Sequence, residues 1–218
     1  IFVDITANDK VAGVYDQLLE KSISVVACNK VAASSAYDNY KKIKDLSRKF
    51  NSQFLFETNV GAGLPVIATL NDLVHSGDRV HKIQAVLSGT LNFVFNNYDG
   101  TRKFADVVKQ AQDEGYTEPD PRLDLGGTDV MRKIMILARE AGVKIEMDNI
   151  ANNSFMPPAC MQGTVEDFYK EMANEEEHFK KLVEEANAAG CKLKFVASFD
   201  NGKASVGLQH IDPMHDLY

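Results

Sequence analysis

The chain has 218 residues, which is long enough for one large domain or two small ones with a sizeable buried core. With 44% apolar and 25% charged residues, the composition is typical of a globular protein, and no apolar run approaches the ~20 residues of a membrane span. The net charge of -7 disfavours nucleic acid as a partner, because no basic face dominates.

Residues 1–60 alternate between strand-like and helix-like patterns. Apolar, β-branched runs at 1–6, 23–28 and 53–57 predict three strands. Between them lie two amphipathic helix patterns. The apolar stripe of the first is Val11, Val14, Tyr15, Leu18 and Leu19; that of the second, behind a cap at Ser34 or Ser35, is Tyr37, Tyr40, Ile43, Leu46 and Phe50. This alternation predicts right-handed crossovers and a parallel sheet.

Parallel sheets bind ligands at the carboxyl ends of their strands. In this chain the rule indicates Thr6, the pair Asn29-Lys30 and the loop Glu57–Leu64. We therefore expect these polar segments to lie along one edge of the sheet.

After residue 60 the pattern becomes α+β. Helices are predicted from Pro65, Leu91, Phe104 and Val130, with a further one behind a capping box at Thr164 and Asp167. Strands are predicted at 80–87 and in a hairpin of 193–199 and 204–208, joined by a type I′ turn at Asn201-Gly202. We place a domain boundary near residue 60.

The stretch from Glu118 to Lys133 concentrates charge around a proline-stiffened loop and the start of a helix. It contains the carboxylates Glu118, Asp124 and Asp129 before Lys133. Asp129 and Lys133 are i and i+4, so they lie on one helix face and one ligand could contact both. Such a set suits a site that holds a zwitterionic small molecule and moves a proton. The alternative is an exposed ion pair worth only ~0.3–0.5 kcal/mol.

Other polar positions leave two interpretations open. Gly61-Ala62-Gly63 resembles a dinucleotide-binding turn only weakly, because residue 66 is Val, and a tight turn with positive φ explains it as well. Glu57 is either a monovalent-cation ligand or a surface strand end, and Ser88-Gly89-Thr90 is either an anion site or an ordinary N-cap. Lys30 is either a ligand-edge lysine or a solvated one.

Cysteine, histidine and glutamate patterns indicate structure and not chemistry. The three cysteines (Cys28, Cys160 and Cys191) lack a Cys-x-x-Cys pair and are typical of reduced, mostly buried thiols in a cytoplasmic protein. The five histidines show no metal-ligand spacing. The run Glu175-Glu176-Glu177 is typical of a solvated helix face.

Several stretches resemble homoserine dehydrogenase, specifically the form fused behind an aspartate kinase, over nearly the whole chain. They are Val25–Lys30, Glu57–Pro65, Leu87–Leu91, Gly115–Pro121 and Leu125–Lys133. The resemblance implies an α/β fold, with a partial Rossmann-type parallel sheet followed by an α+β catalytic and dimerisation domain. Residues 1–60 would be the C-terminal part of the dinucleotide-binding domain, and 61–218 the catalytic domain, truncated at its C-terminus.

The resemblance also implies an activity and site residues. The family interconverts L-homoserine and L-aspartate 4-semialdehyde with NAD or NADP, in the threonine and methionine branch of amino-acid biosynthesis. Lys133 matches the general acid/base and Lys30 a second lysine beside substrate and cofactor. The remaining implied positions are Glu118, Asp129, Asp124, Tyr116 and Thr90 for substrate, Thr6, Ser88 and Gly89 for cofactor, and Glu57 with the carbonyls of Val60, Ala62 and Leu64 for sodium or potassium.

This chain differs from the family pattern at several places. A family member should begin with a glycine-rich phosphate turn and continue beyond Tyr218, so we expect this piece to bind nicotinamide cofactor poorly and to be inactive alone. Cys28, Leu123 and Gly126 depart from the family pattern in minor ways.

A homodimer and a preceding aspartate kinase domain are expected as partners, besides the small-molecule substrate. The alternatives are a non-catalytic oligomerisation or regulatory module, and a dehydrogenase for another amino acid or a sugar.

Overall fold

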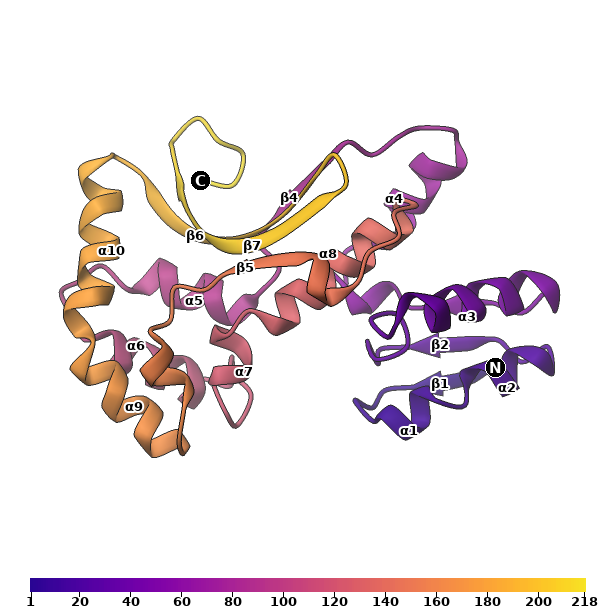
Figure 1. Cartoon of the computed structure of the whole chain (residues 1–218), viewed down its shortest axis with the longest axis horizontal. Helices are drawn as coiled ribbons and strands as arrows, with labels where there is room; N and C mark the ends of the chain where they lie inside the picture. The colour runs from indigo at the N-terminus through magenta and orange to yellow at the C-terminus, as the bar shows by residue number, and fades with distance from the viewer. The chain divides into compact units, whose positions relative to one another are not determined.

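The structure, a computed structural model, describes all 218 residues and is of the mixed α/β class expected from the sequence. The chain divides into two compact units (Figure 1). The first unit comprises residues 1–82, 132–150 and 199–204, and the second 83–131, 151–198 and 205–218. Helix α8 (Thr128–Glu140) contributes residues to both units.

The first unit contains the predicted parallel sheet. Strands β1 (Phe2–Asp4), β2 (Val25–Ala27) and β3 (Phe54–Leu55) lie in the order β1-β2-β3. Phe2 is opposite Val25, and Val25 is opposite Phe54, so all three strands run parallel in register. Their carboxyl ends therefore share one edge of the sheet, as the alternating pattern predicted.

The helices of the first unit differ in detail from the sequence pattern. They are α1 (Asp9–Ala12), α2 (Tyr15–Glu20), α3 (Tyr37–Lys49), α4 (Val66–His75) and the 3-10 helices η1 (Glu57–Asn59) and η2 (Met147–Asn149). The single helix predicted around Val11 is wrong, because α1 ends at Ala12, with Gly13 as its C-cap, and α2 begins at Tyr15. Glycine is a poor helix former, and Val14, expected in the buried stripe, is exposed.

The predicted serine cap of α3 is also wrong. Ser34 and Ser35 donate their hydroxyls to the carbonyls of Lys30 and Ala32 and so close the preceding turn. The N–H of Tyr37 at the start of α3 instead donates to Glu146 Oε1 at 2.8 Å. A carboxylate at a helix N-terminus satisfies a free N–H and favours the helix dipole. This cap comes from a residue far away in the sequence, so no local pattern indicated it.

The second unit is built around a four-stranded sheet in the order β4-β6-β7-β5 (Figure 1). Its strands are β4 (Lys82–Ala85), β5 (Ile150–Asn153), β6 (Lys192–Asp200) and β7 (Lys203–Ile211), and a few end residues group with the first unit. The predicted hairpin is confirmed: Asn201 and Gly202 have φ of 45° and 86°, as a type I′ turn requires. Strand β5 was not predicted.

The helices of the second unit enclose an aromatic core. They are α5 (Gly89–Asn97), α6 (Phe104–Asp113), α7 (Arg122–Leu125), the 3-10 helix η3 (Pro158–Met161), α9 (Val165–Asn174) and α10 (Glu176–Ala188). Phe104 stacks on Phe179 with ring centroids 4.0 Å apart. The solvated role expected for Glu176 is wrong, because its carboxylate accepts from Tyr98 Oη at 2.9 Å and from the Phe104 N–H at 2.9 Å. It caps α6.

The three cysteines differ in their exposure to solvent. All three cysteines are free, but only Cys160 is buried, while Cys191 is half-buried and Cys28 is exposed, so the expectation of mostly buried thiols is wrong. Burial raises the pKa of the Cys160 thiol to about 11, which keeps it protonated near neutral pH.

None of the helices combines the length and the apolar composition needed to span a bilayer.

Candidate functional site

The carboxyl edge of the parallel sheet carries Thr6 and Lys30. Thr6 is exposed just beyond β1, and its N–H donates to Asp4 Oδ1 at 2.8 Å. Lys30 follows β2 and is half-buried. The edge is therefore polar where the ends of two neighbouring strands meet, as expected.

A buried carboxylate, Asp4, organises this edge. Its Oδ2 accepts hydrogen bonds from the Tyr15 hydroxyl and from Asn29 Nδ2, the latter at 3.0 Å. Burial acts to raise the pKa of Asp4, but these hydrogen bonds and that of the Thr6 N–H outweigh it and hold the pKa below its usual value. Asn29 also donates to the Asn8 carbonyl at 3.1 Å. The residue before Lys30 is thus anchored to the first strand and its following loop.

The loop after β3 contains the residues expected to bind a cation. The two carboxylate oxygens of Glu57 accept the N–H groups of Ile67 and Ala68, each at 2.8 Å, so Glu57 caps α4. Gly61 has a φ of 83°, and an added Cβ would come within 2.5 Å of Val66 Cγ2, so the turn requires glycine there. Val60 is buried, while Ala62 and Leu64 are exposed.

In the second unit, the start of α5 reaches the charged loop. Ser88 accepts the Leu91 N–H at 3.1 Å and is an ordinary N-cap, while Gly89 is exposed. Thr90 is buried, and its Oγ1 lies 2.5 Å from the Tyr116 carbonyl oxygen and 3.1 Å from Asp124 Oδ1. A hydroxyl has one hydrogen, so Thr90 donates to only one of these two oxygens at a time.

Asp124 is a carboxylate of the charged loop whose pKa is raised. It lies in α7, within the segment expected to be a loop, and its Oδ2 accepts the Glu118 N–H at 2.9 Å. Burial raises the pKa of Asp124, and the negative charges of Glu118 and Asp129 add to this, while the bonds from Glu118 and Thr90 oppose it. A cation bound beside Asp124 would act in the opposite direction and lower this pKa. Glu118 and Tyr116 are exposed, and Tyr116 stacks on Phe93 at 4.6 Å.

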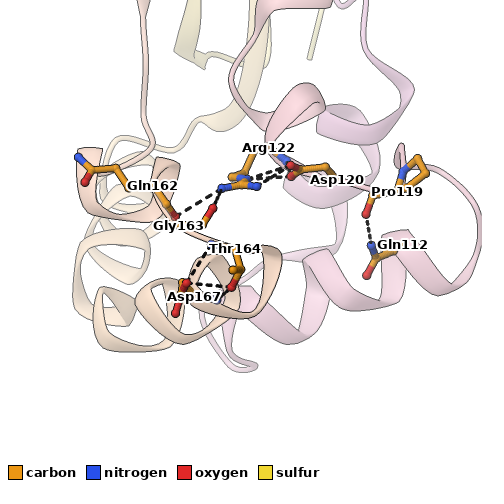
Figure 2. A network of polar contacts seen from close by, with 8 residues as sticks. All are labelled: Gln112, Pro119, Asp120, Arg122, Gln162, Gly163, Thr164 and Asp167. Atoms are coloured by element: carbon orange, nitrogen blue, oxygen red, sulfur yellow. Dashed lines mark hydrogen bonds and ion pairs between the residues drawn. The ribbon is translucent and has the colours of Figure 1, made fainter.

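A polar network fixes the loop that carries these acids (Figure 2). Arg122 pairs with Asp120 through Nε and Nη2, at 2.8 and 2.6 Å, and its Nη1 donates to the Gly163 carbonyl at 2.7 Å. The next residue, Thr164, forms the predicted capping box with Asp167 at the start of α9. On the other side, Gln112 Nε2 donates to the Pro119 carbonyl at 3.1 Å. The loop is therefore held at two points.

Helix α8 carries Asp129 in its first turn and Lys133 one turn later, and both are half-buried. Of the residues expected at the site, Lys30 and Lys133 belong to the first compact unit. The expected substrate-binding residues belong to the second unit: Glu118, Asp124, Asp129, Tyr116 and Thr90. No group of three or more histidine, cysteine, aspartate or glutamate side chains is arranged to hold a metal ion.

Sequence reasoning missed a second charged cluster at the end of α8. Arg139 and Glu140 are both buried, and Glu140 accepts from the Tyr40 hydroxyl and from Lys44 Nζ, the latter at 2.9 Å. Burial and the Glu140 charge raise the pKa of the Tyr40 hydroxyl above its usual value. The signal in the sequence was an apolar run, residues 134–138, that ends in a charged pair without a break in the helix.

Comparison with known proteins decides the family. The homoserine dehydrogenase family model matches residues 65–218, which is most of the chain. The chain belongs to the homoserine dehydrogenase family. Among curated relatives it is 39% identical over 218 residues to the bifunctional aspartokinase/homoserine dehydrogenase 2 of Escherichia coli, and 43% identical over 201 residues to bifunctional aspartokinase/homoserine dehydrogenase 1 of Arabidopsis thaliana. It is 38% identical over 224 residues to the homoserine dehydrogenase of Schizosaccharomyces pombe.

The chain is shorter than these relatives. It covers 27% of the Escherichia coli protein, 22% of the Arabidopsis protein and 60% of the Schizosaccharomyces pombe protein, while 92% to 100% of its own length is matched.

Solved structures agree on the fold. A protein of unknown function from Candida auris is 38% identical, with a TM-score of 0.91 over 98% of this chain and 62% of its own. A hyperthermophilic archaeal homoserine dehydrogenase in complex with NADPH is 22% identical, with a TM-score of 0.73 over 99% of this chain and 57% of its own. At that identity the likeness shows the fold alone.

Proposed function

We propose that this chain carries the catalytic groups of a homoserine dehydrogenase, which interconverts L-homoserine and L-aspartate 4-semialdehyde with NAD or NADP. The observation that carries the proposal is the acidic cluster of the second unit. Asp124 is held in place by Thr90 and the Glu118 N–H, and its pKa is raised by burial and by two neighbouring negative charges. Lys133 lies one helical turn beyond one of those charges, Asp129.

The acids suit the ammonium group of an amino-acid substrate. A bound ammonium would neutralise the mutual repulsion of Glu118, Asp124 and Asp129, so substrate binding and relief of that repulsion favour each other. Tyr116 and Thr90 complete the proposed substrate residues. Tyr116 presents an exposed ring, and the Thr90 hydroxyl lies within hydrogen-bond distance of Asp124 and of the Tyr116 carbonyl.

Two lysines are proposed for the chemistry. Oxidation of the alcohol requires a base for the hydroxyl proton, and Lys133 in its neutral amine form can accept it. The positive charge of Lys30 would stabilise the negative charge that develops on the substrate oxygen. The bound nicotinamide supplies the hydride acceptor, or in the reverse direction the hydride donor.

The residues at the sheet edge and at the start of α5 fit a cofactor. Thr6 is exposed beyond β1, at the edge where parallel sheets bind ligands. Gly89 is exposed at the first position of α5, where no atom approaches the place of a Cβ, so a ligand can reach the backbone. We propose that Thr6, Lys30, Ser88 and Gly89 contact the cofactor.

The loop after β3 offers only oxygen donors, which is the ligand type that hard cations prefer. We propose that Glu57 and the carbonyls of Val60, Ala62 and Leu64 would hold sodium or potassium. Each carboxylate oxygen of Glu57 retains a second lone pair beside its bond to α4. The cap of α4 and a cation ligand are thus compatible roles for one side chain.

The same proposal includes the roles of the two domains, the fusion to a kinase and the oligomeric state. Residues 1–60 would form part of the nucleotide-binding domain and residues 61–218 the catalytic domain. The fusion of relatives to an aspartokinase supports a kinase domain in the complete protein. A homodimer in the cytoplasm, acting in threonine and methionine biosynthesis, is the proposed setting.

The test is Lys133→Met in the complete protein, with Arg132→Met as a matched control. Arg132 is the adjacent, exposed residue of the same helix. Removing a general base is expected to lower kcat about 10²- to 10⁴-fold, while the control stays within about twofold. Oxidation of L-homoserine would be followed by the absorbance of the reduced nicotinamide. Full activity in Lys133→Met would contradict the proposal and favour a non-catalytic role for this chain.

A further inference from the structure

One guanidinium in the first unit has every donor engaged. Arg139 is fully buried at its side chain. Its Nη1 donates to the carbonyls of Ala33 and Ser35 at 2.9 and 2.7 Å. Its Nε and Nη2 both donate to the Ile145 carbonyl, at 3.1 and 3.0 Å, and Nη2 also pairs with Glu146 Oε2 at 2.9 Å. The five N–H groups of an arginine are thereby all satisfied.

These bonds join two segments that each carry a proposed catalytic lysine. Ala33 and Ser35 belong to the turn that begins at Lys30, because Ser34 donates its N–H and its hydroxyl to the Lys30 carbonyl, at 2.9 and 2.8 Å. Arg139 lies on α8, the helix that carries Lys133. The guanidinium therefore links the Lys30 turn directly to the helix of Lys133.

Two aromatic rings and a carboxylate add to the contacts of the guanidinium. The rings of Tyr37 and Tyr40 cover it, with centroids 5.6 and 5.3 Å from Cζ. Glu146, which pairs with Arg139 through one oxygen, accepts the first N–H of α3 through the other. The segment before Lys30 is anchored separately, through Asn29 and Asp4. Loss of Arg139 would thus release the segment after Lys30 without removing the anchor of the segment before it.

A buried arginine is a costly way to obtain stability, since a buried ion pair can often be replaced by apolar residues without loss. Its fork of donors is suited instead to fixing two segments in one relative position. We propose that Arg139 is a positioning residue that sets the Lys30 turn against the helix of Lys133, an inference that depends on the proposed function of these two lysines.

The test is a double-mutant cycle in the complete protein, with Arg139→Lys and Lys30→Met. A lysine keeps the charge but cannot reach all the acceptors of the fork. Arg139→Lys alone is expected to lower kcat about tenfold to a hundredfold, because small displacements of catalytic groups have effects of that size. In the Lys30→Met background the same change is expected to lower kcat less than about twofold, because coupled residues are not additive. A merely structural role would give equal factors in both backgrounds, and that result would overturn the inference.

Two further variants keep the result interpretable. Tyr40→Phe removes one of the bonds between α3 and Glu140, leaves that of Lys44, and does not alter the Lys30 turn, so it is expected to lower thermal stability but leave kcat within about twofold. If Arg139→Lys does not fold, Glu146→Gln weakens the same guanidinium pair more gently, and it is expected to show a smaller loss with the same dependence on Lys30. Full activity in Lys30→Met alone would refute the proposed role of Lys30, whereas an inactive Lys30→Met with an unaffected Arg139→Lys would refute only the present inference.

Discussion

At the scale of single residues, Asp124 shows how the fold changes the chemistry of a side chain. Burial and the charges of Glu118 and Asp129 raise its pKa above the ordinary value of 3.8. The ionised form is the one that attracts a substrate ammonium. We therefore predict that KM for L-homoserine rises as the pH falls through this raised pKa, a range in which an ordinary aspartate would still be ionised. The measurement is the pH profile of kcat/KM.

The same residue predicts a pH dependence of stability. Because the folded protein raises the pKa of Asp124, its ionisation is less favourable in the folded than in the unfolded state. Its contribution to stability is complete below the ordinary pKa and is lost as the pH rises through the raised pKa. Asp124→Asn should remove both this decline and the acidic limb of kcat/KM. In Asp99→Asn, which changes an exposed aspartate outside the cluster, both should persist, and an unaltered profile in Asp124→Asn would contradict the assignment.

At the scale of elements, the acidic loop depends on its attachment to α9. Arg122 connects Asp120 to the Gly163 carbonyl beside the capping box of α9, as Figure 2 shows. We predict that Arg122→Met raises KM for L-homoserine severalfold and changes kcat less, because Glu118 and Asp124 lose their fixed position. Stability should change little, since the pair is partly exposed.

The matched control for this prediction is Arg102→Met. Arg102 is an exposed arginine of the same unit that bonds Gln110 and no part of the loop. Amide hydrogen exchange of residues 115–125 provides the second measurement, and faster exchange is expected in Arg122→Met alone. Unchanged KM together with unchanged exchange would show that Arg122 does not hold the loop.

Among the helices and strands, those set by local sequence patterns could be predicted from the sequence. The hairpin at Asn201-Gly202 and the capping box at Thr164 follow from patterns a few residues long, and the parallel sheet follows from the alternation of such patterns along residues 1–60; all three are confirmed. The cap of α3 by Glu146 and that of α6 by Glu176 join residues distant in the sequence, so no local pattern contains them. The partners of Arg139 are also distant in the sequence, and the only local sign of this cluster was the apolar run 134–138 that ends in a charged pair. The roles of Lys30 and Lys133 stay predictions.

At the scale of the whole molecule, the division of the chain by contacts differs from its division by proposed role. A boundary near residue 60 separates the proposed nucleotide-binding part from the proposed catalytic part. By contacts, however, residues 132–150 group with residues 1–82. Within the first unit, Arg139 and Glu140 on α8 bond to the 33–35 turn and to α3. Part of the proposed catalytic helix is therefore built into the first unit.

This grouping predicts the behaviour of a nicked protein. The exposed loop Ala62–Leu64 is a suitable place for a protease to cut. We predict that residues 1–60 remain attached after cleavage there, because Arg139 holds the 33–35 turn while Glu140 and Glu146 hold α3. Native size-exclusion chromatography should give one peak that contains both pieces on a denaturing gel. In Arg139→Met the pieces should separate at a lower urea concentration, since the turn loses its two carbonyl contacts. Separation of the wild-type pieces without denaturant would show instead that residues 1–60 form an independent body.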